Sequence, residues 1–148
     1  VMFFTGFTRF SSDIQNKNLI DKKSRYHELN EIKSLVDEGE RILTDKKRNL
    51  DDFGRLLDYT WQLKKKTGSA VSTSAIDQLY EKGIKAGALG GKLLGAGGGG
   101  FLLFYVQPER KESLITTMSD LLHIPFHFEN GGSQVVYYAS ENYIVEEA

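Results

Sequence analysis

The sequence of 148 residues contains no cysteine and only two prolines. The absence of cysteine excludes disulfide bonds, thiolate metal sites and a cysteine nucleophile. The formal net charge of −1 excludes a strongly basic surface of the kind that binds nucleic acid or anionic membranes. No apolar run reaches the length of a membrane span, and the first residues lack the layout of a signal peptide. We therefore expect a cytoplasmic protein that binds neither nucleic acid nor membrane.

The sequence is also poor in histidine, with three residues in total. His27, His123 and His127 are too scattered to form a metal-ligand pattern, and no Ser, His and Asp spacing indicates a catalytic triad. The acidic residues fit helix caps, turns and solvated helix faces. We therefore predict no metal site in this chain.

The composition is that of an ordinary globular domain, with 40% hydrophobic and 26% charged residues. The length suffices for one hydrophobic core. The sequence has no internal repeat and no linker that would divide it. These features predict a single domain over residues 1–148, with residues 140–148 as a peripheral tail.

Apolar periodicity and capping residues predict the secondary structure. Short apolar runs predict strands, whereas apolar residues spaced by three or four predict helices. The order of strands and helices, with two strand pairs separated by a helix, favours an α+β fold. The expected strands are Val1–Thr5, Lys92–Leu94, Phe101–Val106, Pro125–Glu129 and Ser133–Ala139, and the expected helices begin near Ile14, Ser24, Asn49, Ser74 and Pro108.

The helix expected from Ser24 to Thr44 carries an apolar stripe that we predict to face the core. The opposite face is charged and is expected to face solvent. Gly39 lowers the stability of this helix by just under ~1 kcal/mol relative to alanine, and we attribute it to close packing. The stripe consists of Leu29, Ile32, Val36 and Leu43, widened by Tyr26, Leu35 and Ile42, and the charged face consists of Glu31, Lys33, Glu38 and Arg41.

Three consecutive lysines, Lys64, Lys65 and Lys66, end the helix expected after Asn49. Cations are favourable at a helix C-terminus because the last carbonyl groups carry a partial negative charge. A lysine run can also bind phosphate or nucleic acid. We assign these lysines to the helix end.

A glycine-rich segment of Gly95, Ala96, Gly97, Gly98, Gly99 and Gly100 separates two expected strands. Glycine loses more backbone freedom on folding than any other residue, so such a run indicates positive φ angles or a close approach of another group. Consecutive N–H groups in this geometry can hold an anion, which makes phosphate the first ligand to consider. A tight strand connection without a ligand is the alternative. The segment matches neither GxxxxGK[ST] nor GxGxxG.

The run Gly-Lys-Leu-Leu-Gly-Ala-Gly-Gly-Gly-Gly-Phe, which ends at Phe101, resembles the third motif of the GHMP small-molecule kinases. This family includes the galactokinase, homoserine, mevalonate and phosphomevalonate group. Two further segments, Phe4–Arg9 and Ala86–Leu94, are similar to the branch that phosphorylates D-glycero-D-manno-heptose 7-phosphate at its anomeric hydroxyl. The resemblance spans nearly the whole chain.

The resemblance implies that the chain is the C-terminal domain of such a kinase, folded as a ferredoxin-like α/β sandwich with extra helices. It implies that the glycine-rich segment borders the phosphoryl-transfer site beside the nucleotide-binding loop. That loop, the catalytic Asp and the contacts to ATP and Mg²⁺ then belong to an N-terminal half that this sequence does not contain. The chain alone is therefore expected to be inactive and to hold no tightly bound cofactor. Leu94 stands where the family often has a hydroxyl residue, so a hydroxyl contact from this position is absent.

Substrate contacts are expected near the N-terminus, where Arg9 follows a strand end. Its guanidinium group can bind a sugar phosphate through two hydrogen bonds, with a surface or interdomain salt bridge as the alternative. Thr5 and Thr8 are further candidate substrate contacts, as are Ser11 and Ser12.

Several functions stay open at this point. The chain fits the C-terminal domain of an ATP-dependent heptose-phosphate kinase, or of a galactokinase-like or mevalonate-kinase-like member of the family. It also fits a stand-alone module that binds phosphate or another small anion, or a structural unit that pairs with another domain. A missing N-terminal half would leave apolar surface uncovered, which predicts self-association into, for example, a homodimer.

Overall fold

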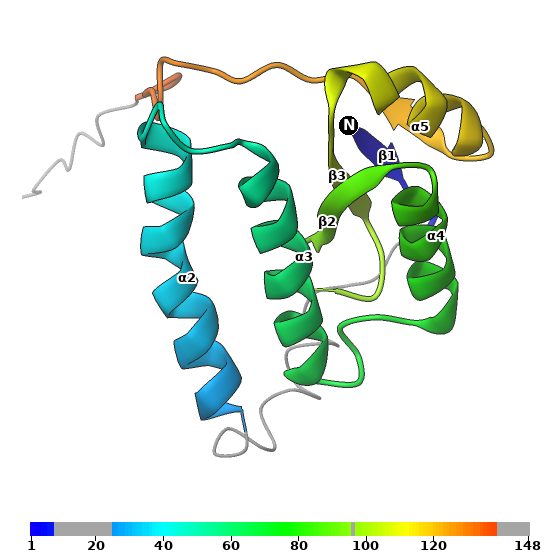
Figure 1. The fold of residues 1–148 in the computed structure, drawn as a ribbon, viewed down its shortest axis with the longest axis horizontal. Helices are drawn as coiled ribbons and strands as arrows, with labels where there is room; N and C mark the ends of the chain where they lie inside the picture. The colour runs from blue at the N-terminus through cyan, green and yellow to red at the C-terminus, as the bar shows by residue number, and fades with distance from the viewer. Residues whose placement is uncertain (8–24, 96, 139–148) are drawn as a thin grey trace, which may run out of the picture.

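The computed structural model of the protein describes residues 1–7, 25–95 and 97–138. Within these ranges the chain forms four strands and four α-helices (Figure 1). The helix expected near Ile14 lies outside the described residues. The elements are β1 (Met2–Phe4), α2 (Tyr26–Thr44), α3 (Asp51–Lys66), α4 (Ser74–Lys85), β2 (Ala88–Leu94), β3 (Phe101–Val106), the 3₁₀ turn η2 (Pro108–Arg110), α5 (Lys111–Thr117) and β4 (Leu122–Ile124).

The four strands form one antiparallel sheet in the order β2-β3-β1-β4. Helices α2, α3 and α4 connect β1 to β2, and α5 connects β3 to β4. The two crossing connections place β1 between β3 and β4 in the sheet. This arrangement is the α+β ferredoxin-like sandwich predicted from the sequence.

The hydrophobic core lies between one face of the sheet and helices α3, α4 and α5, with Trp61 contributed by α3. Leu93, Leu102 and Phe3 are directly opposite one another on neighbouring strands, so they share this face, and all three are fully buried. Leu114 and Met118 from the α5 region complete the core from the helix side. Helix α3 lies along the sheet at β2, and α2 packs outside α3 as a further layer (Figure 1).

Helix α2 is rotated relative to the sequence-based prediction. Its buried residues are Gly39 and Ile42, whereas Leu29, Val36 and Leu43 of the predicted inward stripe are more than half exposed. The predicted solvent face is partly covered instead, because Glu31 and Glu38 lie toward the neighbouring segments. The hydroxyl of Tyr59 on α3 donates to Glu31, and Arg41 and Arg48 pair with Glu38 at 2.9 and 2.6 Å.

The prediction of two C-terminal strands was wrong over residues 125–138. This part of the chain contains no strand, and Phe128, Val135 and Tyr138 are more than four-fifths exposed. The final strand is the shorter segment Leu122–Ile124, which pairs with β1. A strand needs a neighbouring strand to satisfy its hydrogen bonds, and residues 125–138 meet none within the described chain. Ala139, the last residue of the second predicted strand, lies outside the described residues.

Smaller differences concern the ends of elements. Thr73, rather than Ser74, caps α4, because its Oγ1 accepts the N–H of Ile76 at 3.3 Å. The helix predicted from Pro108 begins as a 3₁₀ turn and ends at Thr117, and Leu122 belongs to β4. Strand β2 also starts earlier than predicted, at Ala88.

Candidate functional site

The glycine-rich segment connects β2 to β3 and has the backbone geometry that requires glycine. Gly95, Gly97, Gly98 and Gly100 have φ angles of +91°, +113°, +72° and +106°. These angles lie in the left-handed region, which side chains other than glycine rarely adopt. The prediction of positive φ angles in this loop is therefore confirmed.

Two hydrogen bonds hold this glycine loop against neighbouring segments. The N–H of Gly98 donates to the carbonyl oxygen of Val71 at 3.0 Å, and the N–H of Gly100 donates to that of Phe7 at 2.8 Å. A Cβ on Gly97 would lie 2.7 Å from the Val71 oxygen, so the backbones touch. Within the described residues, the N–H groups of Gly97 and Gly99 make no hydrogen bond. Gly99 is partly exposed, whereas Gly97 is buried.

Thr5 joins the end of β1 to the same loop. Its backbone N–H and its hydroxyl both donate to the carbonyl oxygen of Gly100, each at 2.9 Å. The hydroxyl also accepts the N–H of Phe7 at 3.3 Å, and Thr5 is the buried polar residue of the described chain. These contacts give Thr5 a structural role in holding the loop. Its predicted contact with substrate stays a prediction.

Lys64 contacts the other end of the loop. This residue lies in the last turn of α3, and its Nζ donates to the carbonyl oxygen of Gly95 at 2.8 Å. Burial lowers the pKa of the Lys64 ammonium group, and the positive charge of Lys92 on β2 lowers it further. Lys64 contacts the β2 end of the glycine loop, and Lys92 lies in β2 three residues before Gly95.

Local sequence patterns do not predict a role for Lys64 and Lys92 at the loop. Lys64 fits a helix C-terminus, and Lys92 lies in a short apolar run. One signal was available, since Lys92 follows Gly90 and Gly91 in the strand that leads into the loop. The contact between α3 and the loop joins residues that are 31 positions apart, which local sequence patterns do not reveal.

The remaining predicted site residues divide into two groups. Gly99 packs tightly, because a Cβ on it would lie 2.5 Å from the carbonyl oxygen of Phe7. Arg9, Thr8 and Ala96 lie outside the described residues. The structure thus brings Thr5 and the glycines together and leaves the predicted roles of Arg9 and Thr8 as predictions.

The glycine loop borders a face of the sheet that is only partly covered. Leu94, Phe101, Phe4 and Leu122 lie opposite one another in a row across all four strands, next to the loop. Phe101 is 38% exposed and Leu122 is 64% exposed. This apolar row is suited to contact with another domain.

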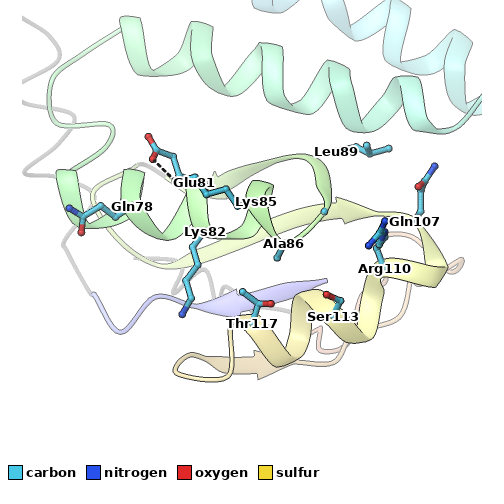
Figure 2. A pocket seen from close by; sticks show the side chains of 11 residues that line it. Gln78, Glu81, Lys82, Lys85, Ala86, Leu89, Gln107, Arg110, Ser113 and Thr117 are labelled. Atoms are coloured by element: carbon cyan, nitrogen blue, oxygen red, sulfur yellow. Dashed lines mark ion pairs between the residues drawn. The ribbon is translucent and has the colours of Figure 1, made fainter.

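An open pocket lies elsewhere, between α4, η2 and α5 (Figure 2). Its volume is about 780 Å³, and it reaches Gly87 before β2, at the opposite end of that strand from the glycine loop. Lys82 in its wall pairs with Asp120 at 2.6 Å, and Lys85 pairs with Glu81 at 4.0 Å. It contains no predicted site residue, so we do not assign the site to it.

No group of three or more His, Asp or Glu side chains that would suit a metal ion occurs in the described ranges. Among those same residues, no helix is both long and apolar enough to span a membrane. The polar groups around the loop include N–H donors and the ammonium group of Lys64, which are donors of the kind that suit phosphate oxygens.

A family model described as GHMP kinases C terminal matches residues 41–123. The chain belongs to the GHMP kinases. The matched segment contains α3, α4, the glycine loop and its two strands. The resemblance inferred from the glycine motif is confirmed, and the chain belongs to a family of phosphotransferases.

Two relatives of this GHMP domain carry the names of sugar kinases. D-glycero-alpha-D-manno-heptose 7-phosphate kinase from Campylobacter jejuni is 32% identical over 120 residues, which cover 80% of this chain and 35% of that protein. L-fucokinase/L-fucose-1-P guanylyltransferase from Bacteroides fragilis is 31% identical over 107 residues, which cover 69% of this chain and 11% of that protein. The chain therefore spans about a third or less of the length of these relatives.

A solved structure shares the fold of this GHMP domain. Mevalonate kinase from Methanococcus jannaschii superposes with a TM-score of 0.66 at 26% sequence identity, over 80% of this chain and 35% of that one. The antiparallel sheet and its helices are thus those of a GHMP kinase C-terminal domain.

Proposed function

We propose that this chain is the C-terminal domain of an ATP-dependent sugar kinase that phosphorylates the anomeric hydroxyl of D-glycero-D-manno-heptose 7-phosphate. The observation that carries the proposal is the 32% identity to a kinase of that name over 80% of the chain. Mevalonate kinase from Methanocaldococcus jannaschii matches a shorter part, at 35% identity over 46% of the chain. The longer match favours a sugar phosphate as the acceptor.

The glycine loop supports a role in phosphoryl transfer. This reaction depends mainly on positioning the phosphates and neutralising their charge. When bound, ATP supplies the phosphoryl group. The N–H groups of Gly97 and Gly99, unpaired within the described residues, are donors of the kind that hold phosphate oxygens, and the contacts with Val71, Phe7 and Lys64 fix the loop in place.

An N-terminal half is the partner that this proposal requires. As the resemblance to the family implies, the catalytic Asp and the contacts to Mg²⁺ are assigned to that half. The apolar row around Phe101 and Leu122 lies beside the loop and gives that half a surface to pack on. When the N-terminal half docks, this row is buried. In the isolated chain the row stays exposed, which is why self-association is expected there.

The requirement for two halves can be tested with a chimera. The segment of the Campylobacter kinase that matches this chain is replaced by the chain itself, and ATP consumption is measured with heptose 7-phosphate. We expect turnover by the chimera and none by the 148-residue chain alone. A chimera that folds, as judged by its melting transition, but shows no turnover would contradict the proposal.

Arg9 and Thr8 are the proposed contacts to the sugar phosphate. In the active chimera, Arg9→Gln is expected to raise KM for heptose 7-phosphate about tenfold or more, because a charge-assisted contact to phosphate is lost. KM for ATP should change little. An equal rise in both KM values would place Arg9 away from the acceptor.

A further inference from the structure

Lys64 and Lys92 are exceptional among the lysines of the described residues. Four of these lysines are partly buried: Lys64, Lys65, Lys82 and Lys92. Lys65 pairs with Asp77 at 3.3 Å, and Lys82 pairs with Asp120 at 2.6 Å. Neither Lys64 nor Lys92 takes part in an ion pair with any described residue.

The absence of a carboxylate matters because the two ammonium groups also repel each other. A partly buried cation loses hydration, and a second cation nearby adds a further cost. Both effects act on Lys64, whose pKa is lowered by burial and then by Lys92. An arrangement of this kind is stabilised when an anion binds between the cations.

The surroundings of the pair favour phosphate over a single carboxylate. Lys64 Nζ already contacts Gly95, the first residue of the glycine loop. The N–H groups of Gly97 and Gly99, which make no hydrogen bond within the described residues, belong to the same loop. Two cations match the double negative charge of a phosphate group, whereas a carboxylate carries one charge.

We propose that Lys64 and Lys92 form a phosphate-binding pair at the β2 end of the glycine loop. This inference rests on the proposed function, because it takes the phosphate to be that of ATP or of the sugar-phosphate acceptor. Lys64 both holds the loop at Gly95 and contacts the phosphate, and Lys92 provides the second charge.

In the test, inorganic pyrophosphate is titrated into the 148-residue chain. Binding is monitored by NMR from the amide signals of the loop glycines. Saturable shifts of Gly95 and Gly97 are expected. Lys92→Gln should weaken pyrophosphate binding about tenfold, because a charge-assisted contact is lost. This variant leaves the loop intact, since Lys92 makes no hydrogen bond to it within the described chain.

Three further variants complete the test. Lys64→Gln should weaken binding as Lys92→Gln does, and Lys64→Arg should retain most of it because the charge is kept. Lys66→Gln is the matched control, since this neighbouring lysine is exposed and unpaired among the described residues, and binding should stay within about twofold. Equal affinity in wild type and Lys92→Gln, or the absence of saturable shifts in the wild type, would overturn the proposal.

Separate titrations with ATP and with heptose 7-phosphate then identify the source of the phosphate. The ligand whose affinity falls in both glutamine variants is the one that the pair binds. The outcome of the chimera assay is independent of the outcome of this binding test. A chimera without turnover combined with lysine-dependent pyrophosphate binding would reject the heptose kinase assignment and keep the anion site.

Discussion

Gly90 of β2 lies directly against Gly54 of α3, and a Cβ on Gly90 would collide with the carbonyl oxygen of Gly54. The colliding atoms are backbone atoms, which cannot move aside as a flexible side chain can. The pair therefore sets the distance between α3 and the sheet. Because α3 also carries Lys64, the same contact positions the ammonium group that reaches the glycine loop.

Gly90→Ala is therefore expected to destabilise the protein by about 3 kcal/mol or more, as overpacking against backbone does. Urea unfolding of the chain measures this change. The control is Gly39→Ala in α2, where a Cβ would lie 3.4 Å from Leu56 Cδ2, an ordinary contact. This control should be neutral or stabilising by up to ~1 kcal/mol, because alanine favours a helix. Similar losses in both variants would refute the close α3–β2 contact.

The orientation of α2 can be tested with two neighbouring residues. Ile42 is 2% exposed and Leu43 is 57% exposed. Ile42→Ala should cost about 2–4 kcal/mol of unfolding free energy, because it leaves a cavity in the packed side of the helix. Leu43→Ala should stay within about 0.5 kcal/mol. If Leu43→Ala proves the more damaging variant, the outward position of Leu29, Val36 and Leu43 is wrong.

Tyr80 links α4 to α3 and to the sheet. Its hydroxyl donates to Asp58 Oδ1 at 2.7 Å and lies 3.3 Å from the carbonyl oxygen of Gly91. Tyr80→Phe should cost about 1–2 kcal/mol, since the hydrogen bond is lost while the ring contacts with Trp61 and Phe104 remain. Thermal or urea unfolding at neutral pH measures the cost.

The same residue predicts a pH effect. Burial, and then the hydrogen bond to Asp58, raise the pKa of Tyr80 above its ordinary value of 10.0. The unfolded chain then loses this proton near pH 10 while the folded chain keeps it, so unfolding is favoured as the pH rises further. The stability difference between wild type and Tyr80→Phe should shrink above pH 10. A constant difference would mean that the phenol ionises in the folded state.

The structural role of Thr5 gives a further prediction. Thr5→Val keeps the shape of the side chain but removes the hydroxyl that donates to Gly100 and accepts from Phe7. We expect a loss of about 1–2 kcal/mol, because the partly buried N–H of Phe7 loses its acceptor and the Gly100 oxygen loses one of its two donors. Thr44→Val is the control, since its hydroxyl bonds to the Glu40 carbonyl on an exposed helix surface and its loss should cost less. Equal effects would argue against a bracing role for Thr5.

The sequence predicted the elements of the fold better than their packing. The apolar runs identified β3 with its correct ends, and the glycine segment identified the loop, because both signals are local. The periodicity of α2 showed an apolar stripe but not which side α3 would cover. Ion pairs at Glu38 and the hydroxyl of Tyr59 favour the opposite face, and these partners lie in other segments.

The candidate site was predictable only where its signal is local in the sequence. The glycine motif identifies the loop from its residue types alone. The position of Lys64 depends on how α3 packs against β2, which brings Gly54 and Gly90 into contact. The pairing of Lys64 with Lys92 is therefore a tertiary feature that appears only in the folded chain.

The most direct measurement for the account as a whole compares two chimeras. In one, this chain replaces the matching segment of the Campylobacter heptose 7-phosphate kinase, and in the other it replaces that of the Methanocaldococcus mevalonate kinase. Phosphoryl transfer is measured in each with the acceptor of the parent enzyme. The account predicts turnover of heptose 7-phosphate by the first chimera and little or no turnover of mevalonate by the second. Turnover of mevalonate by the second chimera with none by the first would contradict the heptose kinase assignment.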